Sequence, residues 1–238
     1  MTSSHLAIRI IGMTDSVAFA EQLSPTPRTT HRRGRHHGVA ERNALFDVLG
    51  SAKLCHLGVI TDGAPLVLPT AYGFDPNGPD QGGTLYLHGS VASRSLTPDG
   101  EICVTITLLD GLVLARSSFH HSMNYRSAVI LGTPRIVTDT EERLTALNLI
   151  VDQVVPERSG HLRASTRKEL AATLVLALPL HESSVKARTG GPGDDTADIG
   201  VEKVWAGVIP ASTQFGEPLP AEDLDSDIPL PEHVTLLT

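Results

Sequence analysis

The chain has 238 residues, of which 40% are hydrophobic and 19% are charged, and this composition is sufficient to build a globular core. Only 4% of the residues are aromatic, so the core must be mainly aliphatic. The net charge of −8 argues against nonspecific binding to nucleic acid or to an anionic membrane, because both need basic surface. No apolar run approaches the roughly 20 residues that span a bilayer, and the first residues lack the pattern of a signal peptide.

The two cysteines, Cys55 and Cys103, each lie in an apolar run that resembles a strand. A cysteine in such a position behaves as a small hydrophobic residue, so we expect two reduced core thiols and a cytoplasmic protein. A disulfide or a metal pair is the alternative.

Residues 1–38 are expected to form a partly flexible N-terminal arm, which ends in the basic sequence RTTHRRGRHHG. No aromatic residues alternate with these charges, so the arm is interpreted as solvated or as clasping a partner, rather than as a nucleic-acid or metal site. After the arm, apolar residues at helical intervals predict a short amphipathic helix over residues 39–49.

A series of strand signals follows. Strands are predicted over residues 53–61 and 65–74, joined by the hairpin dipeptide Asp62-Gly63. Because Pro69 cannot donate to a ladder, that point should be an edge, a bulge or a strand end. Residues 75–83 have the composition of a loop, and further strands are predicted over 84–88 and 101–109. Asp110-Gly111 is expected to form a second tight turn before a strand over 112–115.

The later part of the chain mixes strands and helices. A strand over 127–138 is predicted to bend at Gly132-Thr133-Pro134, and a helix over 139–154 to begin with a capping box of Asp139 and Glu142. A short helix over 166–173 and a strand over 174–180 follow. Residues 183–200 are polar and rich in glycine and are expected to be a loop, 201–209 a last strand, and 217–230 an extended, acidic, proline-rich segment.

Six or seven strands joined by tight turns predict a mostly β, closed or nearly closed antiparallel barrel with a few peripheral helices. A doubly wound sheet would need a helix between most strands. We therefore expect a single barrel domain over residues 39–216, preceded by the arm and followed by an extended C-terminal tail over residues 217–238.

Polar side chains at the ends of predicted strands point to a phosphate site. Ser90, Ser93 and Arg94 follow one strand and Arg126 with Ser127 another, and a forked cation with hydroxyl groups suits phosphate. The strand that contains Pro69 should lie beside them in a meander, where its interrupted ladder frees backbone groups for a ligand. His120 and His121 are adjacent on a strand and point to opposite faces, so no metal site is predicted there.

Four segments together resemble the pyridoxamine 5′-phosphate oxidase-related, flavin-nucleotide-binding family, in the branch of the 5-nitroimidazole-resistance nitroreductases. They are LPTAY, LYLHGSVASR, LVLARSSFHHSMNYRS and VWAGVIP. HLGVITDGAP and ESSVKARTGGP also fit the family, and the resemblance spans about residues 28–235.

The resemblance implies an FMN-binding split β-barrel of Greek-key-like antiparallel strands, which forms a homodimer with FMN at the interface. It implies isoalloxazine contacts in the first segment, ribityl and phosphate contacts in the second, and completion of the pocket by the third and fourth. Carried onto this chain, these cofactor-binding residues are Leu68, Pro69, Thr70, Ala71, Tyr72, His88, Ser90, Ser93, Arg94, Ser122, Asn124, Tyr125, Arg126, Ser127 and Trp205.

The chain departs from the vitamin B6 oxidases of this family in one respect. Those enzymes end in a substrate-binding Arg-Leu-x-Pro motif, and this chain has Trp-Ala-Gly-Val-Ile-Pro at that place. Vitamin B6 oxidation is therefore not expected.

The resemblance favours an FMN-dependent oxidoreductase that passes electrons from NADH or NADPH through the flavin to a small acceptor. The catalytic residues are unknown; His120 and His121 are candidates for a proton donor, because histidine titrates near neutral pH. Two alternatives remain open: a non-catalytic flavin-binding or sensing protein, and a split barrel that holds a deazaflavin or haem.

Overall fold

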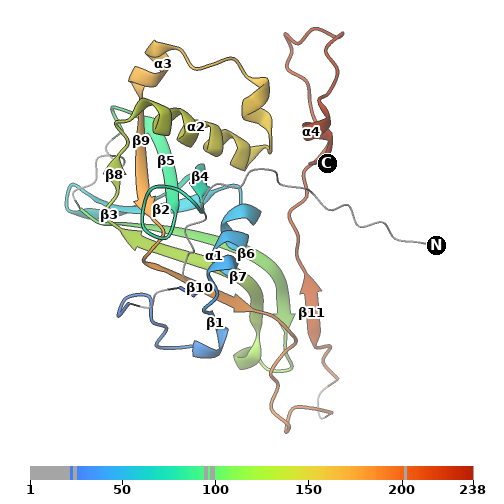
Figure 1. Ribbon diagram of the computed structural model, residues 1–238. Helices are drawn as coiled ribbons and strands as arrows, with labels where there is room; N and C mark the ends of the chain where they lie inside the picture. The colour runs from blue at the N-terminus through green and yellow to red at the C-terminus, as the bar shows by residue number, and fades with distance from the viewer. Residues whose placement is uncertain (1–21, 24–25, 94–95, 97–99, 201–202, 238) are drawn as a thin grey trace, which may run out of the picture.

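The computed structural model describes residues 22–23, 26–93, 96, 100–200 and 203–237. Within this part of the chain, two antiparallel sheets form a split β-barrel, with helices on its outside (Figure 1). The first sheet has the order β1-β10-β7-β6-β2-β3, with β11 also paired to β6, and the second has the order β4-β5-β9-β8. The predicted mostly β, antiparallel fold is confirmed.

The strands have the following bounds: β1 Gly38–Val39, β2 Cys55–Thr61, β3 Ala64–Thr70, β4 Tyr72–Asp75, β5 Thr84–Ser90, β6 Ile102–Leu114, β7 Ser122–Gly132, β8 Arg135–Ile136, β9 Thr173–Pro179, β10 Ser183–Arg188 and β11 Gly207–Pro210. The helices are α1 Arg42–Ser51, α2 Thr140–Val154, α3 Arg167–Ala172 and α4 Glu232–Thr235, with short 3-10 turns η1 Arg35–His37, η3 Ser118–His120 and η4 Arg158–His161. No helix among the described residues is both long and apolar enough to cross a membrane.

The Asp62-Gly63 hairpin forms as predicted, because both residues adopt the positive φ that a tight turn between twisted strands requires (53° and 76°). The return strand predicted over 65–74 is instead divided in two. It leaves the first sheet after Thr70 and enters the second at Tyr72, so β3 and β4 belong to different sheets. Pro69 lies on β3, the edge strand of its sheet, as the missing donor requires.

Two predictions about β6 and β10 were wrong. Asp110-Gly111 is not a turn: β6 continues through it to Leu114, and the pairing with β7 shifts register between Leu109 and Gly111. This shift is a β-bulge, which bends a strand without ending it. Residues 183–188, predicted as loop, form β10, which pairs with both β7 and β1.

The predicted helices are present, within a few residues at their ends. Asp139 caps α2 by accepting a hydrogen bond from the backbone N–H of Glu142 at 2.8 Å, while the Glu142 side chain bonds Arg135 and Tyr86 instead of closing the box. A full capping box forms at α3, between Thr166 and Glu169. Of the last predicted strand, 201–209, residues 201–202 lie outside the described residues, and among the rest only the short β11 is a strand.

The core has two layers. The larger one fills the space between the two sheets and α1, and includes Leu49, Leu87, Val104 and Ile130. The smaller one lies between α2 and the outer face of the second sheet, around Tyr86 and Ile150. Both thiols are free as predicted; Cys55 is fully buried, and burial raises its pKa to about 12.

Residues 22–23 and 26–38, the described part of the predicted arm, contact the barrel. Leu23 is buried in the main core, and Gly38 and Val39 form β1 on the edge of β10. At the other end of the chain, residues 211–231 contain neither helix nor strand, and Figure 1 shows them running along the outside of the barrel from β11 to α4.

Candidate functional site

The first group of predicted site residues gathers where β3 passes into β4, beside the second half of β5. Tyr72 of β4 pairs with Leu87 of β5, which brings Pro69, Thr70 and Ala71 close to His88 and Ser90. Among the described strands, β3 pairs with β2 alone, so one side of its backbone has no strand partner. We call these residues (Leu68–Ala71 and His88–Ser93) the β3–β5 group.

Within this group, the environment of His88 is the one that most clearly indicates a ligand contact. Its Nδ1 is buried and has no hydrogen-bond partner among the described residues, and burial lowers the pKa of its imidazole. A buried polar atom without a partner costs free energy, so it marks a place where a ligand atom can be accommodated. A neutral imidazole can donate to such a ligand or accept from it.

The serines after β5 form a tight turn. The hydroxyl of Ser90 accepts the backbone N–H of Ala92 at 3.2 Å, and the N–H of Ser93 bonds the carbonyl of Ser90 at 2.9 Å. Ser90 is exposed and Ser93 is half-buried. Arg94, the predicted phosphate cation, lies outside the described residues.

Tyr72 lies in the core, whereas Leu68 lies partly exposed on β3. The Tyr72 side chain is fully buried, and its hydroxyl donates to the carbonyls of Leu49 and Ala52 at the end of α1. These carbonyls lack partners inside the helix, so Tyr72 closes the end of α1 and cannot present its ring to a cofactor. Leu68 is half-buried opposite Leu57 on the barrel side of β3.

The second group of predicted residues lies on β7, and we call it the β7 group (Ser122–Ser127). Asn124 is buried, and both ends of its amide are used: it donates to the carbonyl of Gly190 and accepts from Arg188. Ser127 and Tyr125 lie on the outer face of the sheet, opposite Lys186 and Arg188 of β10. Ser122 is exposed at the start of the strand.

Arg126 is held by the bulge in β6. Its Nε and Nη2 donate to the two carboxylate oxygens of Asp110 at 3.0 and 2.8 Å, a bidentate ion pair. The hydrogen bond with Asp110 raises the pKa of Arg126. A guanidinium committed in this way is not free to bind phosphate, so the prediction of that role for Arg126 is not supported by its geometry.

The structure does not bring the two groups together within one chain. They were predicted on neighbouring strands of a meander, but β5 belongs to the second sheet and β7 to the first. Within the first sheet, β3 is separated from β7 by β2 and β6. With strands about 4.8 Å apart, that separation is roughly 14 Å.

The remaining candidates lie at the far end of β7 and near β11. His121 is exposed, with Nδ1 bonded to the carbonyl of Ser117 at 2.9 Å, whereas Nε2 of His120 lies 3.2 Å from the Asp195 carboxylate without hydrogen-bond geometry. Trp205 is 64% exposed, just before β11. No three histidine, cysteine, aspartate or glutamate side chains gather as a metal site in the described ranges.

Two cations beside the β7 group belong to the segment ESSVKARTGGP but were not among the predicted site residues. Lys186 pairs with Ser127 and Arg188 with Tyr125, and both were assigned to a loop. The alternation of Ser183, Val185 and Ala187 with Ser184, Lys186 and Arg188 was the signal that could have identified the strand.

The two sheets and their connections define the chain as a protein of the split β-barrel class. A family model described as pyridoxamine 5′-phosphate oxidase matches residues 41–187, more than half of the chain. The chain belongs to this family, as the sequence motifs predicted.

Solved structures give a closer comparison. The chain is 34% identical to the flavocytochrome Anf3 from Azotobacter vinelandii, with a TM-score of 0.81 over 91% of this chain and 99% of that one. It is 40% identical to an FAD and haem binding protein from Mycobacterium smegmatis, with a TM-score of 0.75 over 85% of this chain and 97% of that one.

A putative 5-nitroimidazole antibiotic resistance protein from Bacteroides thetaiotaomicron is 22% identical, with a TM-score of 0.51 over 63% of this chain and 85% of that one, and this similarity extends to the fold alone. The comparison with curated proteins finds no match.

Proposed function

We propose that this chain is a flavin-dependent redox protein that also binds haem. The observation that carries the proposal is its identity of 34% and 40%, over most of both chains, to a flavocytochrome and to an FAD and haem binding protein. The sequence motifs favoured FMN, whereas the name of the second relative specifies FAD. Both flavins share the isoalloxazine ring, the ribityl chain and the first phosphate, so the same residues can serve either.

The β3–β5 group fits the flavin ring and ribityl chain. One side of β3 has no strand partner among the described strands, so backbone groups on that side are available to the nitrogen and oxygen atoms of a flavin ring edge. His88 adds a neutral ring nitrogen without a partner among the described residues, and Ser90 adds a hydroxyl at the end of the same group. Arg94 is proposed as the phosphate cation.

A homodimer would unite the two groups of the candidate site. Within one chain they are separated by β2 and β6, so one flavin is more readily contacted by the β3–β5 group of one copy and the β7 group of a second. Ser127, on the outer face of the first sheet beside Lys186 of β10, is the member of the β7 group that we propose for such a shared ligand. The two free thiols agree with the proposed cytoplasmic location.

A bound flavin supplies oxidation of NADH or NADPH and return of the electrons to a small acceptor such as a nitro compound, a quinone or O₂. The chain's own residues position the ring and can deliver a proton to the acceptor. His121 is the better candidate of the two neighbouring histidines, because Nδ1 donates to the carbonyl of Ser117 and Nε2 is left accessible; Nε2 would deliver a proton from the imidazolium form of the ring.

The visible spectrum of the purified full chain tests the proposal. We expect flavin absorption together with the sharp bands of haem, and extraction followed by chromatography distinguishes FMN from FAD. Absence of flavin, even after incubation with FMN, FAD and haem, would overturn the proposal. Anaerobic stopped-flow mixing with NADH and NADPH then separates an oxidoreductase, which is reduced quickly, from a flavin-binding or sensing protein, which is reduced very slowly.

A further inference from the structure

The C-terminal segment over residues 211–231, here called the acidic strap, is fixed at its two ends. At one end β11 pairs with β6 from Gly207 to Pro210. At the other end His233 is 93% buried, and its ring stacks on that of His161, with centroids 4.2 Å apart. Between these attachments the strap forms no strand or helix and runs along the outside of its own barrel (Figure 1).

The strap exposes apolar side chains that a lone chain leaves in water. Leu219 is 91% exposed, and four others along the strap are about half exposed: Phe215, Leu224, Ile228 and Leu230. Apolar side chains spaced along an otherwise ordered segment are typical of a binding surface. Between them the strap carries Glu217, Glu222, Asp223, Asp225 and Asp227 and no lysine or arginine, and none of these carboxylates has an ion pair among the described residues.

A surface of the opposite character lies at the start of the chain. We call it the basic surface: Arg32, Arg33, Arg35, His36 and His37, joined by Lys186 and Arg188 of β10. These side chains are close together, since Nζ of Lys186 reaches the carbonyl of Arg33, and the pKa of His37 is lowered first by burial and then by the neighbouring His36, Arg188 and Lys186. None of these residues has a carboxylate partner among the described residues.

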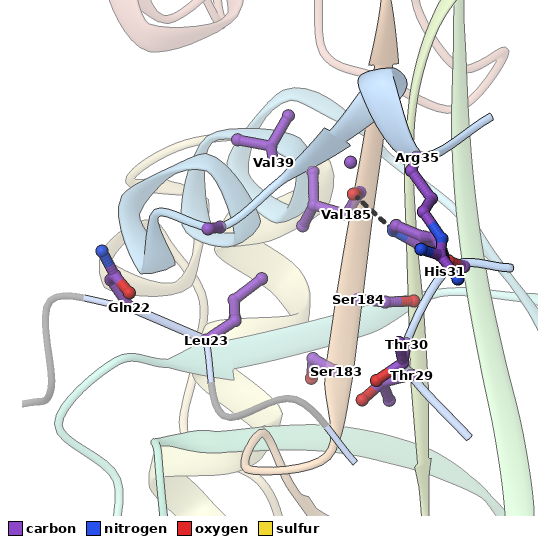
Figure 2. Close-up of a pocket in the computed structure, with 12 residues that line it drawn as sticks. Gln22, Leu23, Thr29, Thr30, His31, Arg35, Val39, Ser183, Ser184 and Val185 are labelled. Atoms are coloured by element: carbon purple, nitrogen blue, oxygen red, sulfur yellow. Dashed lines mark hydrogen bonds between the residues drawn. The ribbon is translucent and has the colours of Figure 1, made fainter. Parts of the chain in front are cut away.

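Beside the basic surface is a pocket of about 300 Å³ (Figure 2). Leu23, Val39 and Val185 give it apolar walls, and His31 and Arg35 stand at one side. Nε2 of His31 is bonded to the carbonyl of Val185, and Nε of Arg35 to the carbonyl of His31, so both side chains are held in place. A pocket of this size accepts an aliphatic side chain, and the Arg35 guanidinium at its side favours carboxylates next to that side chain.

In its own chain the strap is held at both ends, by β11 and by the burial of His233. Figure 1 shows β1 and the basic segment before it on one side of the barrel and the strap on the other. A second copy of the chain presents the same basic surface without this restriction. Because an isologous contact is repeated by symmetry, two such dockings would form in one dimer.

We propose that the acidic strap of one copy docks on the basic surface of a second copy, with one of its leucine or isoleucine side chains seated in the pocket beside His31 and Arg35. This contact deepens the homodimer proposed above and assigns it a location. It accounts for the two strongly charged segments of the chain, which have no ion-pair partner within the described part of one copy.

Charge reversal on the full chain tests the contact. Sedimentation velocity measures the dimer dissociation constant of Arg32→Glu/Arg33→Glu, of Asp223→Lys/Asp225→Lys and of the combined protein. Each pair alone should raise the dissociation constant by roughly tenfold or more, and the combination should restore most of the loss, as expected for paired charges across an interface. Arg167→Glu/Lys168→Glu on α3 is the matched control, with the same change of charge on an exposed helix away from the strap.

A second measurement identifies the docking partner. In Arg33→Lys, which keeps the charge, a carbodiimide can link the new amine to strap carboxylates, and mixing ¹⁵N-labelled with unlabelled protein separates links between copies from links within one. Links between copies support the proposal. The proposal would be overturned by links within single chains only, or by a wild-type protein that is monomeric at all concentrations. It would also be overturned if the α3 control raised the dimer dissociation constant as much as Arg32→Glu/Arg33→Glu does. The spectrum is read in parallel: a monomer with flavin and haem bands refutes the strap contact alone, whereas a dimer without them refutes the proposed function alone.

Discussion

Arg94 and Arg126 were both predicted to bind phosphate, and a pair of alanine variants distinguishes them. In the structure Arg126 is occupied by Asp110 through two hydrogen bonds, at side-chain exposures of 40% and 30%. Arg126→Ala should therefore lower the free energy of unfolding and leave flavin affinity unchanged. Arg94→Ala should weaken flavin affinity and leave the free energy of unfolding unchanged.

The magnitudes follow from exposure and charge. The Arg126–Asp110 pair is half-exposed, so solvent screens it, and its loss should cost about 1 kcal/mol at most, even with bidentate geometry. A charge-assisted hydrogen bond between Arg94 and a flavin phosphate is worth roughly 1.5–3 kcal/mol, which corresponds to a tenfold to hundredfold weaker affinity.

Urea unfolding and fluorescence titration with FMN or FAD measure the two quantities separately. Asp110→Asn completes a double-mutant cycle, in which we expect a coupling energy of about 0.5–1 kcal/mol with Arg126. If Arg126→Ala instead weakened flavin binding by tenfold or more, with unfolding unaltered, Arg126 would be a phosphate ligand and the assignment made from its ion pair would be wrong.

Three further predictions concern the framework. Tyr72→Phe should lower the free energy of unfolding in urea by only about 1 kcal/mol, because Gln153 also donates to the two carbonyls that the Tyr72 hydroxyl contacts. A change in the flavin spectrum of this variant would show that Tyr72 contacts the flavin after all. Gly73→Ala should cost about 1–3 kcal/mol by thermal unfolding, since a Cβ there would lie 2.7 Å from backbone atoms of Leu149 and Ile150, and unaltered stability would contradict this close approach of β4 and α2. Hydrogen bonds from Arg28 and Thr26 lower the pKa of Glu182 to about 2, so its contribution to stability is present above about pH 4.5 and is lost as the pH falls toward 2; Glu182→Gln should flatten that part of the stability curve, and an unchanged slope would refute the contribution.

The fold class and most elements could be predicted because their signals are local. The Asp62-Gly63 turn, the capped start of α2 and the edge position of Pro69 each depend on the chemistry of one or two residues. The division of one predicted strand between two sheets at Ala71 depends instead on what each half meets in space. No pattern within residues 64–75 carries that information.

The same limit explains the errors at the site. Asp110-Gly111 has the composition of a tight turn, but the bond between Asp110 and Arg126 on the neighbouring strand accompanies a bulge within a continuous β6. Tyr72 has the polar tip expected of a ligand contact, and only the nearby end of α1 shows that its hydroxyl serves the core. A polar residue beside a core can satisfy either a ligand or the backbone, and the sequence does not distinguish between these partners.

The two segments that sequence patterns described least well are the basic arm and the acidic tail. A periodic apolar pattern arises when a segment packs one face against its own chain, and neither segment has such a pattern. Their opposite charges, and the exposed apolar side chains of the strap, instead suit a partner outside the chain. If the strap docks as proposed, the absence of periodicity was itself informative, because it marked the segments that contact a second copy.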